Sequence, residues 1–212
     1  ADPDVFENIL EDRLNADLTG GKYKDFEILN FGVADYKPVQ RLIVIEKKAL
    51  SFAPDAIIYT AHYRDFQTRH LADAIKRGTE IPYPDLIKIA EKSGATPEMS
   101  KDEVVSRLSA FESEIVDFVH RRMSEIQKDT GIPVIWVYLP SVKAYTTDEK
   151  AAYERVKENA QKYDFIMIDL FGMYDGQDLS NLWVAEWDSH PNARGNKLIS
   201  DRLFSDFVGD SA

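Results

Sequence analysis

The stretch Ile132-Pro133-Val134-Ile135-Trp136-Val137-Tyr138-Leu139 is the clearest β-strand signal in the chain. It is almost continuously apolar, which is typical of a strand buried on both faces of a parallel sheet. Gly131 ends the helical pattern before it, and Pro140 ends the strand because proline cannot donate to a sheet ladder. The longest helical pattern, Lys101–Thr130, precedes this strand, and another helix, Asp148–Tyr163, follows it. The centre of the chain therefore alternates helix, strand and helix.

The same alternation extends in both directions along the sequence. The spacing of apolar residues predicts helices over Asp4–Leu18, Pro38–Phe52, Phe66–Arg77, Asp85–Lys92 and Asn192–Phe207, and strands over Asp25–Phe31, Ala56–Ala61 and Asp164–Leu170. Such alternation favours a parallel sheet covered by helices on both faces. We therefore expect an α/β fold, a three-layer α/β/α sandwich in a single domain, with a helical insertion over about residues 66–130.

Composition and charge exclude several classes of function. Of the 212 residues, 44% are hydrophobic, which is enough for a folded domain with a sizeable core. The net charge of −11 argues against nucleic acid or an anionic membrane as a partner. The absence of cysteine excludes disulfides and thiolate metal sites, and no apolar run approaches the ~20 residues that span a bilayer. The compartment, cytoplasmic or exported, and the oligomeric state stay open.

Two residues suited to acid–base chemistry stand near the end of the chain, in Trp187-Asp188-Ser189-His190-Pro191-Asn192. Asp188 and His190 are two residues apart on a segment predicted to be a loop, directly before the last helix. Active residues of open α/β sheets gather at the edge where such loops lie. We interpret His190 as a general base and Asp188 as the carboxylate that orients it. The alternative is a surface or capping pair, because Asp-x-His is common by chance.

Three motifs together resemble the SGNH hydrolase superfamily, also called GDSL-type esterases and lipases. They are Asn30-Phe31-Gly32-Val33, Pro54-Asp55 and Asp188-Ser189-His190-Pro191-Asn192. The resemblance covers nearly the whole chain and implies the flavodoxin-like sandwich of that superfamily, with no cofactor. It also implies an ester hydrolase in which a serine attacks the carbonyl, His190 accepts the serine proton and Asp188 orients His190.

The resemblance assigns an oxyanion site at which this sequence departs from the family. Asp35 occupies the position of the family's glycine, and Arg64 occupies that of its asparagine. The backbone N–H of Asp35 and the Arg64 guanidinium can still donate to an oxyanion. The same motifs make Asn30, Gly32 and His62 further candidates for oxyanion or substrate binding, with a structural role at a strand end as the alternative for His62.

The family's first strand and its Gly-Asp-Ser nucleophile motif would stand before Ala1. In this fold the first strand lies between the next two strands, so its loss would leave unpaired strand edges in the core. We therefore expect a further N-terminal segment that supplies both the strand and the serine. Gly209-Asp210-Ser211 follows a predicted helix instead of a strand, and we interpret it as coincidence.

Three functions are compatible with these residues. The leading interpretation is a hydrolase acting on a small-molecule, acyl or carbohydrate ester. The first alternative is a non-catalytic binding or scaffold domain, because a salt bridge between Asp35 and Arg64 would occupy the place of the carbonyl oxygen. The second alternative is an acyltransferase of the same fold, which would use the same residues.

The other polar candidates carry weaker signals. His70 and His120 lie among charged residues of predicted helices, and we expect His70 to be solvated or insertion-facing and His120 to be at the surface. A metal site is conceivable at the sheet edge, from His62, Asp65, Asp35 and His190. Their spacing matches no dense ligand motif, so we expect no metal ion.

Overall fold

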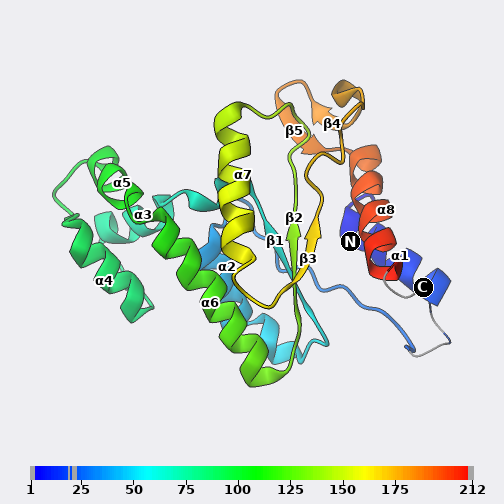
Figure 1. The fold of residues 1–212 in the computed structure, drawn as a ribbon, viewed down its shortest axis with the longest axis horizontal. Helices are drawn as coiled ribbons and strands as arrows, with labels where there is room; N and C mark the ends of the chain where they lie inside the picture. Colours follow the sequence, from blue (N-terminus) through cyan, green and yellow to red (C-terminus); the bar gives the residue numbers. More distant parts are fainter. Residues whose placement is uncertain (1–2, 19, 21–22, 210–212) are drawn as a thin grey trace. The chain divides into compact units, whose positions relative to one another are not determined.

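The computed structural model describes residues 3–18, 20 and 23–209. The chain is a mixed α/β protein, 55% helical, whose central element is a parallel sheet (Figure 1). Its three strands stand in the order β1-β2-β3, with bounds Ile57–Ala61, Val134–Tyr138 and Ile166–Asp169. The predicted α/β class, the parallel sheet and these three strands are confirmed. No helix among the described residues combines the length and apolar character needed to cross a bilayer.

Helices fill most of the remaining chain (Figure 1). They are α1 (Phe6–Leu18), α2 (Pro38–Lys47), α3 (Arg69–Arg77), α4 (Pro84–Ser93), α5 (Lys101–Ser109), α6 (Glu112–Thr130), α7 (Thr147–Ala160) and α8 (Ala193–Gly209), with short 3₁₀ turns η1 (Ala49–Phe52), η2 (Tyr63–Phe66) and η3 (Leu179–Asn181). The predicted single helix over Lys101–Thr130 is wrong in one respect, because it is broken between α5 and α6. Helix α5 packs mainly on α3, whereas α6 packs mainly on α2 and α7, and α4 contacts both pieces.

Contacts between residues divide the chain into two compact units, each of which is described by itself. The first unit comprises residues 1–31, 137–146 and 168–212, and the second comprises residues 32–136 and 147–167. In the first unit α1 packs along α8. The Arg13 guanidinium lies 3.8 Å from the ring centre of Phe204 and donates to Asp201 Oδ1 at 2.8 Å. Residues Asp210 and Ser211, which complete the tripeptide interpreted as coincidence, lie outside the described residues.

The predicted strand over Asp25–Phe31 is not formed. A strand needs a neighbour to complete its backbone ladder, and no strand of the described chain pairs with this segment. Side chains four residues apart on α1, which therefore share one helix face, bond to alternate residues of the segment instead. Asn15 pairs with the backbone N–H and C=O of Phe26 at 2.8 Å each, Glu11 accepts from the N–H of Ile28, and Glu7 accepts from the side-chain amide of Asn30 at 2.7 Å.

His120 lies in the core of the second unit with 1% of its surface exposed, so the prediction of a surface position is wrong. Helix α7 covers the face of α6 that carries it, and His120 Nδ1 lies 2.6 Å from Asn159 Oδ1. The Asn159 amide nitrogen donates to Asp117 Oδ1 at 3.2 Å. Because the amide oxygen therefore faces His120, the imidazole carries its proton on Nδ1. Burial lowers the pKa of His120 to about 4, which keeps the ring neutral.

Candidate functional site

The Asp188–His190 pair belongs to the first unit and lies in a strand, where a loop was predicted. Strand β4 (Trp183–Ala185) pairs antiparallel with β5 (Asp188–Pro191), with Ala185 opposite Asp188. Residues two apart in a strand project to the same side, which brings the two side chains together. Ser189 between them projects to the opposite side. The sequence did not indicate this strand, because the segment is short and mostly polar. It lacks the alternation of apolar and polar residues by which a strand is predicted.

The imidazole and the carboxylate are joined by two contacts to one oxygen. His190 Nδ1 is hydrogen-bonded to Asp188 Oδ1, and the His190 backbone N–H donates to the same oxygen at 3.0 Å. These two hydrogen bonds, the backbone one foremost, lower the pKa of Asp188, so the carboxylate is ionised at neutral pH. The His190 side chain is 86% exposed. Among the described residues, Nε2 has no hydrogen-bond partner, and the ring can therefore accept a proton there.

Asn192 and Gly195 fix the hairpin against the start of α8. The Asn192 side chain accepts from the N–H groups of Arg194 and Gly195 at 3.0 and 3.1 Å, which caps the helix. The same side chain donates to the carbonyl of Trp183 at 3.1 Å. A Cβ at Gly195 would stand 2.8 Å from the Leu182 carbonyl oxygen, so only glycine permits this close approach. The hairpin that carries the Asp188–His190 pair, called the dyad below, is therefore fixed by these contacts.

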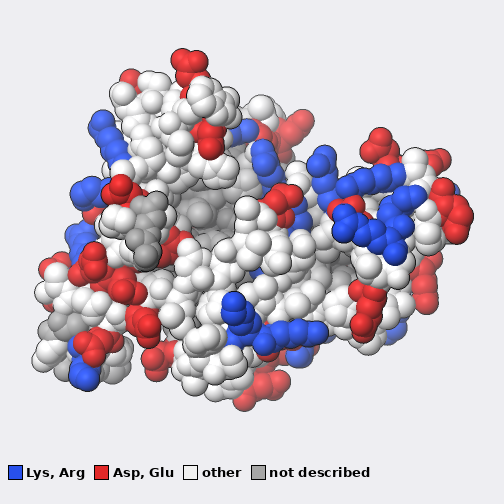
Figure 2. Space-filling view, turned by 180° about the vertical axis from the view of Figure 1, so that it is seen from behind, with Lys and Arg blue, Asp and Glu red and all other residues white. Residues whose placement is uncertain are grey.

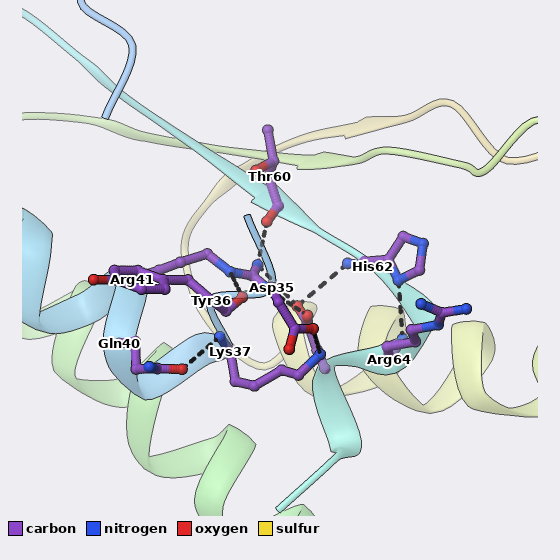
Figure 3. A network of polar contacts seen from close by, with 9 residues as sticks. Asp35, Tyr36, Lys37, Gln40, Arg41, Thr60, His62 and Arg64 are labelled. Carbon is purple, nitrogen blue, oxygen red and sulfur yellow. Dashed lines mark hydrogen bonds and ion pairs between the residues drawn. The ribbon is translucent and has the colours of Figure 1, made fainter. Parts of the chain in front are cut away.

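The second unit holds a polar network after the carboxyl end of β1 (Figure 3). Its centre is an ion pair between Arg41 of α2 and Asp65 of η2, and the Asp65 side chain is only 2% exposed. Arg41 also donates to the backbone carbonyls of Tyr36, at 3.1 Å, and Thr60. Asp65 Oδ2 accepts from the backbone N–H of His62 at 3.2 Å. The pair therefore ties the start of α2 to the chain that leaves β1.

Opposed effects act on the Arg41 guanidinium. Burial lowers its pKa, but the charge of Asp65, aided by Tyr59 and the hydrogen bond to Asp65, raises the pKa by more. The group is therefore a permanent buried cation whose charge is matched by one carboxylate. Sequence reasoning missed Arg41; the only available signal was a lone arginine between the apolar residues Val39 and Leu42 of a predicted helix.

Asp35, at the family's glycine position, has the backbone conformation that favours glycine. It is the third residue of a tight turn in which the Tyr36 N–H donates to the Val33 carbonyl at 3.2 Å, and its φ is 63°. A positive φ at this turn position is typical of glycine or asparagine. The Asp35 carboxylate is 85% exposed and pairs with Lys37 Nζ at 2.8 Å. The hydrogen bond and charge of Lys37 lower the pKa of Asp35.

Arg64 does not form the salt bridge with Asp35 that the non-catalytic alternative invoked. Its Nε donates to the Tyr63 hydroxyl at 3.0 Å, and its guanidinium lies 5.4 Å from the centre of the Tyr63 ring. The salt bridge was the argument for a non-catalytic domain, and the preference of Asp35 for Lys37 removes that argument. The Lys37 ammonium is only two residues away from Asp35 in the chain, so the local chain geometry holds the two groups together.

His62 caps the turn after β1. Its Nδ1 accepts from the Arg64 backbone N–H at 3.2 Å. Burial lowers the pKa of His62 to about 4, so the ring is neutral. Of the other candidates, Asn30 belongs to the first unit, whereas Gly32 and Asp35 belong to the second. The acid–base pair and most of the predicted oxyanion residues are thus described in different units.

No group of three or more histidine, aspartate or glutamate side chains in the described part of the chain is arranged to hold a metal ion. Comparison with known proteins adds no neighbour: no protein-family model, no curated protein and no solved structure matches this chain.

Proposed function

We propose that this chain is the larger part of a serine-dependent ester hydrolase of the SGNH type, with a three-layer α/β/α sandwich. The observation that carries the proposal is the dyad: His190 Nδ1 bonds to an ionised Asp188, directly before the last helix. The substrate class is a small-molecule, acyl or carbohydrate ester. The nucleophile is a serine in a segment that precedes Ala1.

Two further observations support this proposal. Asp35 stands in a left-handed backbone conformation at the position where the family has glycine, as a correct alignment requires. Among the described residues, the sheet order β1-β2-β3 leaves β1 with one strand neighbour. A preceding strand that pairs with β1 would extend the sheet toward that of the proposed fold.

The dyad suggests how each proton moves. As the serine oxygen attacks the ester carbonyl, His190 Nε2 accepts the hydroxyl proton, and the imidazolium is stabilised by Asp188 at Nδ1. Nε2 then gives this proton to the departing alkoxide, which leaves as an alcohol. A water molecule repeats the sequence on the acyl-enzyme and releases the acid. In each half of the reaction the pair takes up one proton and then returns it.

The candidate oxyanion donors that the resemblance assigns, the Asp35 backbone N–H and the Arg64 guanidinium, are described within the second unit alone. Within the described chain, neither the Asp35 backbone N–H nor the Nη atoms of Arg64 donate to a protein acceptor. Both are donors of the kind that stabilises a tetrahedral intermediate. In this proposal the exposed Asp35 carboxylate is neutralised by Lys37, which limits its repulsion of the oxyanion.

The test uses the full-length protein, including residues that precede Ala1, and a fluorophosphonate probe. We expect one covalent adduct by intact mass, mapped to an upstream serine, and hydrolysis of p-nitrophenyl acetate. His190→Ala should lower kcat/KM by about a thousandfold or more. Its Tm should stay unchanged because the ring is 86% exposed. Ser189→Ala, on the opposite side of the strand, is the matched control and should retain activity.

The absence of both adduct and turnover would refute the hydrolase and favour a binding domain. Transfer of the acyl group to an added alcohol or sugar, faster than release of the acid, would identify an acyltransferase that uses the same residues. Labelling that survives His190→Ala would contradict the role of the dyad.

A further inference from the structure

A pocket of about 410 Å³ lies in the second unit, between the start of α2 and helix α3. This volume is within the range of small-molecule sites. Its walls are polar, because they include Lys37 and Gln40 from α2, Arg69, His70 and Arg77 from α3, and Thr79 after it. A pocket with such walls is suited to a polar ligand.

The positive charges of this pocket exceed the negative ones that are free to balance them. The two carboxylates in the wall are already paired, Asp35 with Lys37 at 2.8 Å and Asp73 with Lys101 at 2.7 Å. Arg69 and Arg77 form no salt bridge with a carboxylate among the described residues, although the charge of Arg69 contributes to the lowered pKa of Asp35. Figure 2 shows Lys and Arg side chains gathered over α3 and α5. A local excess of cations in a chain of net charge −11 indicates a site for anions.

His70 supplies an independent observation. Both of its ring nitrogens are buried and neither makes a hydrogen bond of good geometry to a described residue, although the Gln67 backbone lies near enough to act on the pKa of the ring. Buried polar atoms in native proteins nearly always have a partner. Burial, followed by the charge of Lys37, lowers the pKa of His70 to about 4, so the neutral ring offers one donor and one acceptor. A ligand in the pocket would supply the missing partner.

The start of α2 adds a further attraction for negative charge. Pro38 is its first residue, and the Gln40 side chain accepts a hydrogen bond from the backbone N–H of the N-cap residue Lys37 at 3.0 Å. The first turn of a helix carries a partial positive charge from its N–H groups. Lys37, at the same place, is nearly buried, with 9% of its side chain exposed. The Lys37 ammonium and the positive start of α2 thus both attract negative charge to the same part of the pocket.

We propose that this pocket binds a small organic molecule that carries a multiply charged oxyanion group, a phosphate ester or a polycarboxylate. Arg69 and Arg77 are the principal ligand-binding residues, because guanidinium groups bind such oxyanions through paired hydrogen bonds. His70 contributes a neutral hydrogen bond. The proposal rests on the second unit alone and is independent of the proposed ester hydrolysis.

Isothermal titration calorimetry with two probes, pyrophosphate and citrate, tests the proposal and distinguishes the two oxyanions. Each probe is titrated into the full chain at about 0.15 M ionic strength, where weak surface attraction is screened. We expect saturable binding of one probe, or of both, at one site per chain. The double variant Arg69→Gln/Arg77→Gln should bind at least about tenfold more weakly, because each lost charge-assisted bond weakens binding about that much.

Arg202→Gln is the matched control, since Arg202 lies on α8 and pairs with Asp206 at 3.1 Å. It removes one positive charge, as Arg77→Gln alone does, and should leave affinity unchanged. Circular dichroism and Tm verify folding, and the single variant Arg77→Gln replaces the double variant if the latter does not fold. The proposal is overturned if neither probe saturates, or if the arginine variants bind as tightly as the control.

Asp35→Asn provides a test in the opposite direction. Asparagine tolerates the positive φ at this position, and the substitution removes a negative charge while freeing Lys37. We expect affinity for the bound probe to increase several-fold. Unchanged or weaker binding would contradict the inference that the charge balance of the pocket selects its ligand.

Discussion

The ion pair between Arg41 and Asp65 allows a quantitative prediction. Asp65→Asn keeps the size of the side chain but removes its charge. The Asp65 side chain is 2% exposed and accepts hydrogen bonds from both Nη atoms of Arg41 and from the His62 backbone N–H. The NH₂ group of the new asparagine is itself a donor, so it faces one of these three N–H donors without an acceptor. The Arg41 cation also loses its only paired carboxylate among the described residues.

Removing one partner of a buried ion pair costs about 3–5 kcal/mol when both groups are fully buried. The Arg41 side chain is 21% exposed, so water retains some access to its charge. We therefore expect Asp65→Asn to lower the free energy of unfolding by about 3 kcal/mol, at the lower end of this range. For a chain of this size the same loss corresponds to a fall in Tm of about 6–12 °C.

Urea unfolding followed by far-UV circular dichroism measures the change. Arg41→Lys separates charge from geometry, because lysine keeps the charge but cannot bond to Asp65 and to the carbonyls of Tyr36 and Thr60 together. We expect it to cost less than Asp65→Asn. Asp206→Asn, at an exposed i,i+4 pair, should cost less than about 1 kcal/mol. A loss at Asp65 no larger than at Asp206 would refute the buried-pair reasoning.

Three further predictions concern other parts of the fold. Gly195→Ala should destabilise the protein by about 1–3 kcal/mol, because the added Cβ would stand 2.8 Å from the Leu182 carbonyl; a Tm equal to that of the native protein would contradict this close approach. Asn15→Ala should cost about 1–3 kcal/mol in urea unfolding, because it leaves both backbone groups of Phe26 without their partner. Asp12→Ala, at an exposed position of the same helix, is the comparison and should cost less. The lowered pKa of His120, about 4, means that the unfolded state binds its proton first as the pH falls below the ordinary value of 6.5. His120 therefore contributes stability that is complete above about pH 6.5 and lost toward about pH 4, with a slope of about 1.4 kcal/mol per pH unit between them. Urea unfolding across this range should show a correspondingly smaller slope for His120→Gln, and equal slopes would disprove the neutral buried ring.

Local patterns in the sequence determined the helices, the three strands of the parallel sheet and the partners of the dyad. Helix periodicity and continuous apolar runs are properties of adjacent residues, and Asp188 and His190 are near each other in any extended or turned chain. For these features no knowledge of distant contacts was necessary.

Only the tertiary structure decided the features that depend on a partner far away in sequence. Asp25–Phe31 has the composition of a strand, but its backbone bonds to side chains of α1 because a strand forms only beside another strand. His120 stands among arginines and is nevertheless buried, because α7 covers that face of α6. Arg41 meets Asp65 across 24 residues of sequence, and the anion pocket joins the start of α2 to α3. Burial and charge pairing are properties of the packed chain, so they cannot be predicted from apolar periodicity alone.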